Sequence, residues 1–206
     1  MRIVTSSLAA AALLATTSAS AEVTANVGFM SNYVFRGVEQ NDSSAMGGVD
    51  FDHSGFYLGI WSADVGKGLE IDYYGGYNFD IGEFSFGVGG TYYDYTDNFD
   101  DNYQEVNLTA GWRWFTVNAD IGQWDGFGDD QDYQHYALTW EYEGFHLKAA
   151  TFEDDFDGNY FEAGYSTEMA GFDLSAAYIY SNDDLVGTED NSNLMFTISK
   201  TFGLID

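Results

Sequence analysis

Apolar side chains alternate strictly with polar ones or glycine, from Glu105 onward, along Tyr103-Gln104-Glu105-Val106-Asn107-Leu108-Thr109-Ala110-Gly111-Trp112-Arg113-Trp114. Because successive side chains of a β-strand point to opposite faces of a sheet, this period of two predicts a strand with one apolar and one polar face. The apolar face ends in Trp112 and Trp114. Tryptophan rings favour a boundary between an apolar and an aqueous phase. The segment therefore predicts a strand with lipid on one side and water or polar side chains on the other.

The same alternation recurs along the whole chain. Together with 103–114, it predicts strands at 23–36, 49–51, 56–63, 69–79, 84–92, 115–122, 136–142, 145–149, 161–166, 172–180 and 194–202. Tight connections alternate with longer polar ones, as they do in outer-membrane barrels, which have an even number of strands. We predict an all-β fold, a transmembrane antiparallel up-and-down β-barrel of about twelve strands. An even number would place both termini on the periplasmic side.

A soluble β-sandwich is the alternative, because its strands also alternate. Two features favour the barrel. The two faces of nearly every strand differ in the same sense, and the apolar faces carry Tyr, Trp or Phe near their ends, as interfacial girdles do. Within lipid, an open sheet edge would cost several kcal/mol for each unpaired backbone group, so the sheet is expected to close on itself.

The N-terminal segment, residues 1–21, has the features of a secretory signal peptide. Arg2 provides the positive start, residues 8–15 form a short apolar core, and Ala19-Ser20-Ala21 is a cleavage motif. Residues 22–206 would then form the barrel and reside in the bacterial outer membrane. No later apolar run approaches the ~18 residues of a transmembrane helix. The chain has no Cys, which excludes disulfide scaffolds and thiolate metal sites.

The formal net charge of −28 excludes nucleic acid as a partner, because phosphates would be repelled. Four predicted connections hold sixteen of the 34 acidic residues: Asp94, Asp97, Asp100 and Asp101; Asp125, Asp129, Asp130 and Asp132; Glu153, Asp154, Asp155 and Asp157; and Asp183, Asp184, Glu189 and Asp190. Such a rim would attract divalent cations, bridging them to lipopolysaccharide phosphates, or it is simply a solvated acidic surface.

The predicted register places ten charged side chains on the inner face. They are Arg36, Asp50, Glu70, Asp72, Glu105, Asp120, Glu141, Lys148, Glu162 and Asp173. As pore-lining residues they would form a charged constriction that selects solutes. Alternatively, they form a buried ion-pair network that plugs the barrel or fixes its register. Twelve strands lie between the eight that side chains fill and the sixteen that leave a wide channel, so both interpretations stay open.

Other chemistry has weaker signals. Glu153-x-Asp155-x-Asp157-Gly158 resembles the start of a calcium loop, but Gly164 occupies the twelfth position, where a bidentate acid is expected. No H-E-x-x-H or G-x-S-x-G motif is present, so the usual motifs of zinc hydrolases and serine esterases are missing. The sequence therefore predicts no enzyme, no cofactor and no specific metal site.

A family resemblance begins at Ser31-Asn32-Tyr33-Val34-Phe35-Arg36-Gly37-Val38-Glu39-Gln40. This segment resembles the S-[DN]-Y-x-F-R-G-x-[ST]-Q opening of the TorF-type outer-membrane proteins, a proteobacterial family described as porins chiefly by inference. Glu39 replaces the usual Ser or Thr. Further similarity lies in Gly47-Gly48-Val49-Asp50, in residues 55–62, in Glu70-Ile71-Asp72, in Gly76-Tyr77 and in residues 198–202. The resemblance implies an outer-membrane barrel and supplies no catalytic or binding residues.

Two functional hypotheses follow from these observations. The first is an outer-membrane porin that forms a narrow passive channel for small solutes, cation-preferring or neutral because acids dominate its inner face. The second is a plugged barrel with a structural or surface-binding role, whose acidic loops bind divalent cations or lipopolysaccharide. Outer-membrane lipid, lipopolysaccharide and small solutes are the partners expected.

Overall fold

The computed structural model describes residues 21–187 and 189–205. The predicted signal peptide, residues 1–21, lies outside the described residues except for Ala21, and the first strand begins at Glu22. In the described part, twelve strands form one closed antiparallel barrel, as predicted, and two further short strands form a separate hairpin. None of the helical structure in these residues is long and apolar enough to cross a membrane.

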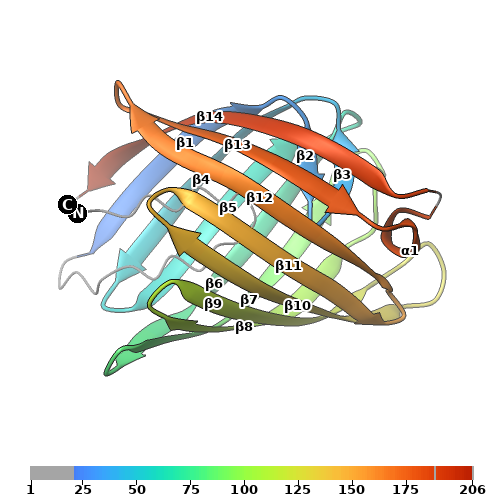
Figure 1. Cartoon of the computed structure of the whole chain (residues 1–206), viewed down its shortest axis with the longest axis horizontal. Helices are drawn as coiled ribbons and strands as arrows, with labels where there is room; N and C mark the ends of the chain where they lie inside the picture. Colours follow the sequence, from blue (N-terminus) through green and yellow to red (C-terminus); the bar gives the residue numbers. More distant parts are fainter. Residues whose placement is uncertain (1–20, 188, 206) are drawn as a thin grey trace.

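The barrel wall follows the order of the chain. Its strands are β1 (Glu22–Met30), β4 (Ser44–His53), β5 (Phe56–Asp64), β6 (Leu69–Ile81), β7 (Phe84–Tyr95), β8 (Tyr103–Trp112), β9 (Phe115–Trp124), β10 (Gln131–Tyr142), β11 (Phe145–Asp154), β12 (Gly158–Met169), β13 (Phe172–Ser181) and β14 (Asn191–Ile205). Each strand pairs with its neighbours in this order, and β1 pairs with β14 to close the ring (Figure 1).

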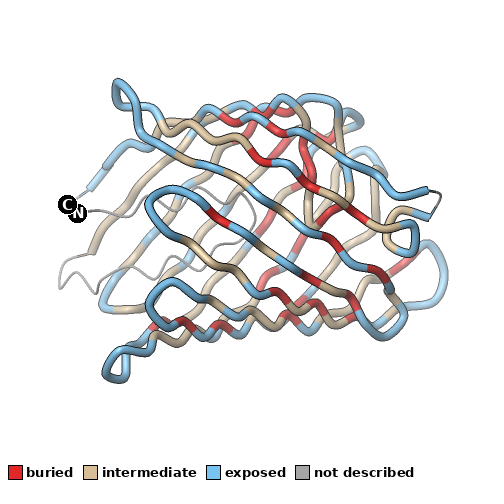
Figure 2. Tube along the Cα trace, viewed as in Figure 1, coloured by how far each residue is buried: buried red, intermediate tan, exposed pale blue. Residues whose placement is uncertain are grey.

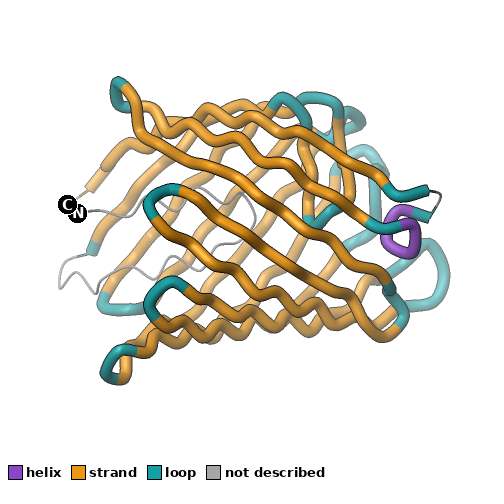
Figure 3. The backbone as a smooth tube through the Cα atoms, in the orientation of Figure 1, coloured by secondary structure: helices purple, strands orange, loops and turns teal. Residues whose placement is uncertain are grey.

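The two ends of the barrel differ. At one end, five two-residue turns connect the strands, at 54–55, 82–83, 113–114, 143–144 and 170–171. At the other end, the connections contain three to thirteen residues, and the one after β13 includes the single short helix of the described residues, α1 (Asp183–Val186) (Figure 3). β1 starts and β14 finishes at the end with the short turns, since Val23 pairs with Ile205 (Figure 1).

The wall exposes apolar side chains outward and buries polar ones inward. On β8, Val106 is 51% exposed and Leu108 41% exposed, whereas Glu105 and Thr109, which flank this stretch, are only 6% and 8% exposed. Figure 2 shows this alternation of buried and exposed positions along the strands. The arrangement is the reverse of a soluble protein, in which large apolar patches are seldom exposed. It is the arrangement expected of strands that face hydrocarbon.

The predicted first strand, 23–36, is wrong in its second half. β1 ends at Met30, and residues 33–41, expected to be the end of a strand and a polar loop, form the hairpin of β2 (Tyr33–Phe35) and β3 (Val38–Asn41). Arg36 and Gly37 connect the two strands with φ angles of 46° and 86°. Positive φ at both central residues defines the tight turn that suits a two-residue hairpin, so the chain reverses there.

The hairpin lies inside the barrel rather than in its wall. Its Tyr33 and Val34 are consecutive and both buried, which a wall strand with one lipid face would not allow. They belong to an apolar interior cluster with Met30, Met46, Ala63, Val65, Ala177, Ile179 and Met195. The interior is therefore apolar on one side of the hairpin and polar around its turn, whereas the sequence predicted a charged interior throughout.

Candidate functional site

The hairpin turn carries Arg36 to the far side of the barrel. In the closed order of the described wall strands, β9 stands six places from β1, and β8 stands five places from β1 by way of β4. Because the ring has twelve wall strands, β8 and β9 lie on the side opposite to the one from which the hairpin starts. Arg36 contacts residues of these two strands, so the hairpin extends across the interior.

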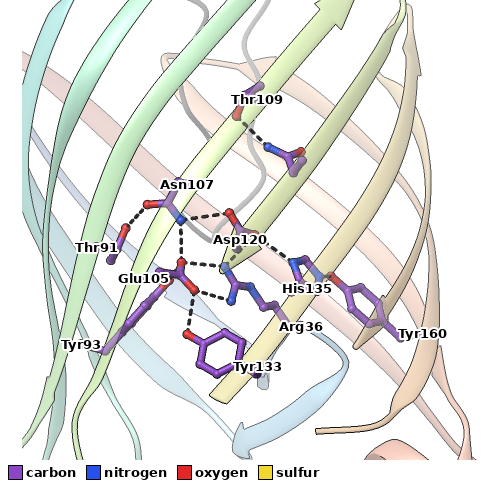
Figure 4. Close-up of polar contacts among 11 residues, drawn as sticks. Arg36, Thr91, Tyr93, Glu105, Asn107, Thr109, Asp120, Tyr133, His135 and Tyr160 are labelled. Atoms are coloured by element: carbon purple, nitrogen blue, oxygen red, sulfur yellow. Dashed lines mark hydrogen bonds and ion pairs between the residues drawn. The ribbon is translucent and has the colours of Figure 1, made fainter. Parts of the chain in front are cut away.

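Arg36 forms a planar, two-pronged ion pair with Glu105 of β8. Its Nη1 and Nη2 atoms each lie 2.8 Å from one carboxylate oxygen of Glu105, and Nη2 lies 3.0 Å from Oδ2 of Asp120 on β9 (Figure 4). The three side chains are 10%, 0% and 9% exposed. Bidentate guanidinium–carboxylate pairs are among the strongest hydrogen-bonded contacts in proteins, and they fix orientation as well as distance.

Neighbouring side chains complete the hydrogen bonding of Glu105. The hydroxyl groups of Tyr93 on β7 and Tyr133 on β10 each donate to it at 2.8 Å. The amide of Asn107 donates to Glu105 at 2.7 Å and to Asp120 at 2.9 Å, which joins the two carboxylates (Figure 4). A buried polar network of this kind is rigid when every member is satisfied.

A second branch extends from Asp120 toward β12. Nδ1 of His135 lies 2.9 Å from Asp120, and Nε2 of the same ring lies 3.1 Å from the hydroxyl oxygen of Tyr160. The rings of His135 and Tyr160 are stacked, with 5° between their planes. The network thus connects five wall strands, from β7 to β10 and β12, to one arginine of the hairpin (Figure 4).

The environment keeps Arg36 charged. Burial lowers the pKa of the guanidinium, but the negative charges of Glu105 and Asp120 outweigh that effect, with Tyr93 also contributing. The pKa of Arg36 therefore lies well above its ordinary value. The positive charge at the hairpin turn is a permanent part of the interior.

Further contacts attach the hairpin to β6, β7 and β13. Tyr33 donates a hydrogen bond of 2.5 Å to Glu70 on β6, and the Ser181 hydroxyl donates to the carbonyl oxygen of Gly37 at 2.7 Å. The ring of Phe35 packs against Tyr93, with 5.6 Å between the ring centroids. The hairpin is therefore attached to the wall at its turn and along β2.

The structure brings only some of the predicted inner residues together. Arg36, Glu105 and Asp120 meet at the turn, and Glu70 and Asp72 are buried side by side on β6. Lys148 and His146 lie 3.9 Å and 2.8 Å from Glu162 in a separate cluster on β11 and β12. Three more acids lie apart from these groups: Asp50, which accepts hydrogen bonds from Tyr74 and Asn26, and the half-buried Glu141 and Asp173.

Sequence reasoning missed the tyrosines of the site. Tyr93, Tyr133 and Tyr160 lie one to three residues outside the predicted strands 84–92, 136–142 and 161–166, although the alternation, continued to them, places them on the inner face. The register alone would have identified them. Tyr93 and Tyr133 bond Glu105, and Tyr160 bonds His135, so their connection to Arg36 is indirect. It depends on the hairpin, which the alternation does not predict.

In the segment 153–158, which resembles the start of a calcium loop, carboxylate oxygens of Asp155 and Asp157 accept hydrogen bonds from backbone N–H groups. Asp155 accepts a hydrogen bond from the backbone N–H of Asp132 at 3.0 Å, and Asp157 accepts one from Gly158 at 2.7 Å. Within residues 21–187 and 189–205, no group of three or more His, Cys, Asp or Glu is placed to hold a metal ion.

A comparison with protein families matches residues 14–202 to the family described as "Bacterial protein of unknown function (Gcw_chp)". The chain belongs to the Gcw_chp family. This match does not test the resemblance of this Gcw_chp chain to the TorF-type proteins, which stays a prediction. A comparison with curated proteins finds no significant match.

Solved structures similar to this Gcw_chp protein show the same type of fold. One, from work described as "Unveiling the Mechanism Behind the in-meso Crystallization of Membrane Proteins", has a TM-score of 0.61 at 10% identity and covers 89% of this chain and 84% of the other. The NanC porin has a TM-score of 0.55 at 9% identity, covering 89% of this chain and 100% of the porin. At such low identity the similarity shows the fold alone.

Proposed function

We propose that this Gcw_chp protein is a narrow outer-membrane channel for the passive passage of small solutes, with the β2–β3 hairpin as its constriction. The observation that carries the proposal is the ion pair between Arg36 at the hairpin turn and Glu105 on the opposite wall. It sets a charged barrier inside a closed barrel whose outer face is apolar. Charged rings and inward-folded segments are the means by which pores of this kind select solutes.

The proposed preference is for cations or neutral solutes. The two carboxylates at the turn already outnumber the single guanidinium, and Glu70, Asp72 and Asp50 add negative charge to the same interior. The acidic connections would raise the local concentration of cations at one mouth and repel anions. These acids and Arg36 are the residues that we propose line the route, together with Lys148 and Glu162.

The proposed location is the bacterial outer membrane. Membership in a bacterial family, the signal-like segment 1–21 and the exposed apolar wall all support it. The end with the two-residue turns would then face the periplasm, as would both termini. Lipid and lipopolysaccharide would surround the wall, and divalent cations would bridge the acidic connections to lipopolysaccharide phosphates.

A permanently plugged barrel is the second candidate, and a specific observation favours it. Met30, Tyr33 and Val34 pack into the apolar interior cluster, which fills one side of the hairpin with close-packed side chains. Water and ions cross such a cluster poorly. In that case the barrel would serve a structural or surface-binding role through its acidic connections.

Single-channel conductance in a planar bilayer separates the two. The purified protein is compared with a variant in which residues 33–41 are replaced by nine Gly and Ser residues, and with Arg36→Ala. Discrete steps from the wild type, larger in both variants, support the channel. A silent wild type with conducting variants supports the plug. Silence from all three, with insertion verified, contradicts a role in conduction altogether.

A further inference from the structure

Glu70 and Asp72 form a second charged group that the hairpin network does not neutralise. Both lie on the inner face of β6, two residues apart, so about 7 Å of strand separates them. Glu70 is 0% exposed and Asp72 is 6% exposed. Oε2 of Glu70 and Oδ1 of Asp72 are buried without a hydrogen-bond partner among the described residues. Native proteins rarely leave buried carboxylate oxygens unsatisfied, because the cost of desolvation is high.

No basic side chain flanks these two acids in the wall. Glu70 pairs with Ala63 on β5 and Tyr95 on β7, and Asp72 pairs with Trp61 and Tyr93 on the same two strands. Arg36 is the nearest cation that acts on both acids, but its donors are directed to Glu105 and Asp120. Four buried carboxylates thus share one guanidinium in this part of the barrel.

The surrounding groups are oxygen donors. Tyr33 donates to Oε1 of Glu70, so the opposite oxygen remains available, and Tyr95 also contacts this carboxylate. A hard cation such as Na⁺, K⁺, Mg²⁺ or Ca²⁺ prefers carboxylate, hydroxyl and carbonyl oxygens. The unpartnered oxygens of Glu70 and Asp72 supply two such ligands that nothing else in the described structure uses.

We propose that Glu70 and Asp72 bind one small hard metal cation inside the barrel. The cation offsets the excess buried negative charge. Because Tyr33 of the hairpin donates to Glu70, the cation also stabilises the contact between the hairpin and β6. With two carboxylates the site is smaller than a group of three or more acidic ligands, which suits weak and reversible binding. It depends on the fold alone and stands whether or not the barrel conducts.

The test compares thermal unfolding in detergent with increasing NaCl, KCl, MgCl2, CaCl2 or choline chloride at matched ionic strength. A cation that binds only the folded state raises the unfolding midpoint in a saturable manner. We expect at least one metal salt to raise the midpoint of the wild type by several degrees more than choline chloride does. Asp72→Asn and Glu70→Gln, which keep the shape of each side chain, should lose that difference. Asp130→Asn, on an exposed connection, should keep it.

Two outcomes would overturn the proposal. In the first, both variants respond to every metal salt as the wild type does, which assigns the effect to the acidic rim. In the second, metal salts act like choline chloride and only pH changes the midpoint, which assigns a shared proton to the pair. For that second outcome, the titratable and charged groups around the pair are Tyr33, Arg36, Tyr93, Tyr95, Asp100 and Glu105.

Crystals of the wild type grown in rubidium chloride or barium chloride provide a measurement that needs no variant. Anomalous scattering between Glu70 and Asp72 would support the site even if the variants fail to fold. Its absence at both ions, in crystals that diffract well enough to show other bound ions, would contradict it.

Discussion

Arg36 and Glu105, 69 residues apart in the sequence, form a bidentate ion pair that joins the interior hairpin to the opposite wall of the barrel. Neither charge is accessible to solvent to any great extent, so each depends on the other. The contact therefore serves two purposes at once. It fixes the hairpin in the interior, and it makes the burial of two wall carboxylates tolerable.

Removing Arg36 should destabilise the barrel strongly. In Arg36→Ala, Glu105 and Asp120 stay buried without their cation, and breaking a buried ion pair from one side costs about 3–5 kcal/mol. We expect the free energy of unfolding to fall by that amount in a urea titration followed by tryptophan fluorescence. The matched control is Arg113→Ala, whose partner is Glu83. Those side chains are 52% and 68% exposed, so the loss should be at most about 1 kcal/mol. Equal losses in the two variants would argue against the hairpin network as a stabilising element.

Gly37 is predicted to tolerate no side chain. It has φ +86°, and an added Cβ would lie 2.8 Å from Cδ2 of Leu185, Oγ of Ser181 and Cβ of Tyr160. Gly171 holds the corresponding place in another two-residue turn, with φ +77° and nothing within 4 Å. Gly37→Ala and Gly171→Ala therefore share the backbone cost, and only the first adds overpacking of about 1–3 kcal/mol. If the two variants lost the same free energy of unfolding within experimental error, the hairpin turn would not be closely packed against Leu185, Ser181 and Tyr160.

A charge on the outer face of the wall should be costly if that face meets lipid. Leu108 lies in the middle of β8 and points outward, so Leu108→Lys should reduce stability in lipid vesicles by about 2–4 kcal/mol. Phe127, on an exposed connection, provides the control, because Phe127→Lys leaves the charge in water. A Leu108→Lys variant that folds in vesicles as well as the control would contradict the lipid-facing assignment.

If the barrel conducts, the acidic connections should influence its selectivity. Neutralising Asp129 and Asp130 together as Asn should reduce the preference for K⁺ over Cl⁻ measured from the reversal potential in a salt gradient. The effect should be largest at low ionic strength, because salt screens exposed charges over about 10 Å at 0.1 M. Glu83→Gln, in a two-residue turn at the opposite end of the barrel, is the control for position and should change the reversal potential less. A reversal potential unchanged by the pair of substitutions would assign selectivity to the interior alone.

The wall could be predicted from the sequence because its rule is local. Each strand alternates, and residues such as Val106 and Glu105 reveal their faces through their neighbours alone. Closure then follows from the need to pair every backbone group in lipid. Strand number and the inward direction of Glu70, Asp72, Glu105 and Asp120 could be derived in this way.

The hairpin could not be predicted by that rule. Tyr33 and Phe35 continue the apolar spacing of β1. A period of two therefore extends the predicted strand past Met30, where β1 ends in the structure. Arg36-Gly37 was the available turn signal, since a Gly at the second position suits a two-residue hairpin. The partners of Arg36 depend on how the closed ring places β8 and β9 opposite β1, and no local pattern contains that information.

The last step in forming the wall, the pairing of β1 with β14, is the one that must bring together the two ends of the barrel sequence. Nearly every ladder joins segments that follow one another along the chain, whereas the seam between β1 and β14 brings together residues such as Phe29 and Ile198, 169 residues apart. Loop-closure entropy rises with the length of chain enclosed, so hairpin-by-hairpin growth of the sheet meets small entropic barriers and the seam meets the large one. The chain would accordingly spend most of its folding time as an open, curved sheet, and the moment of sealing would set its rate of maturation.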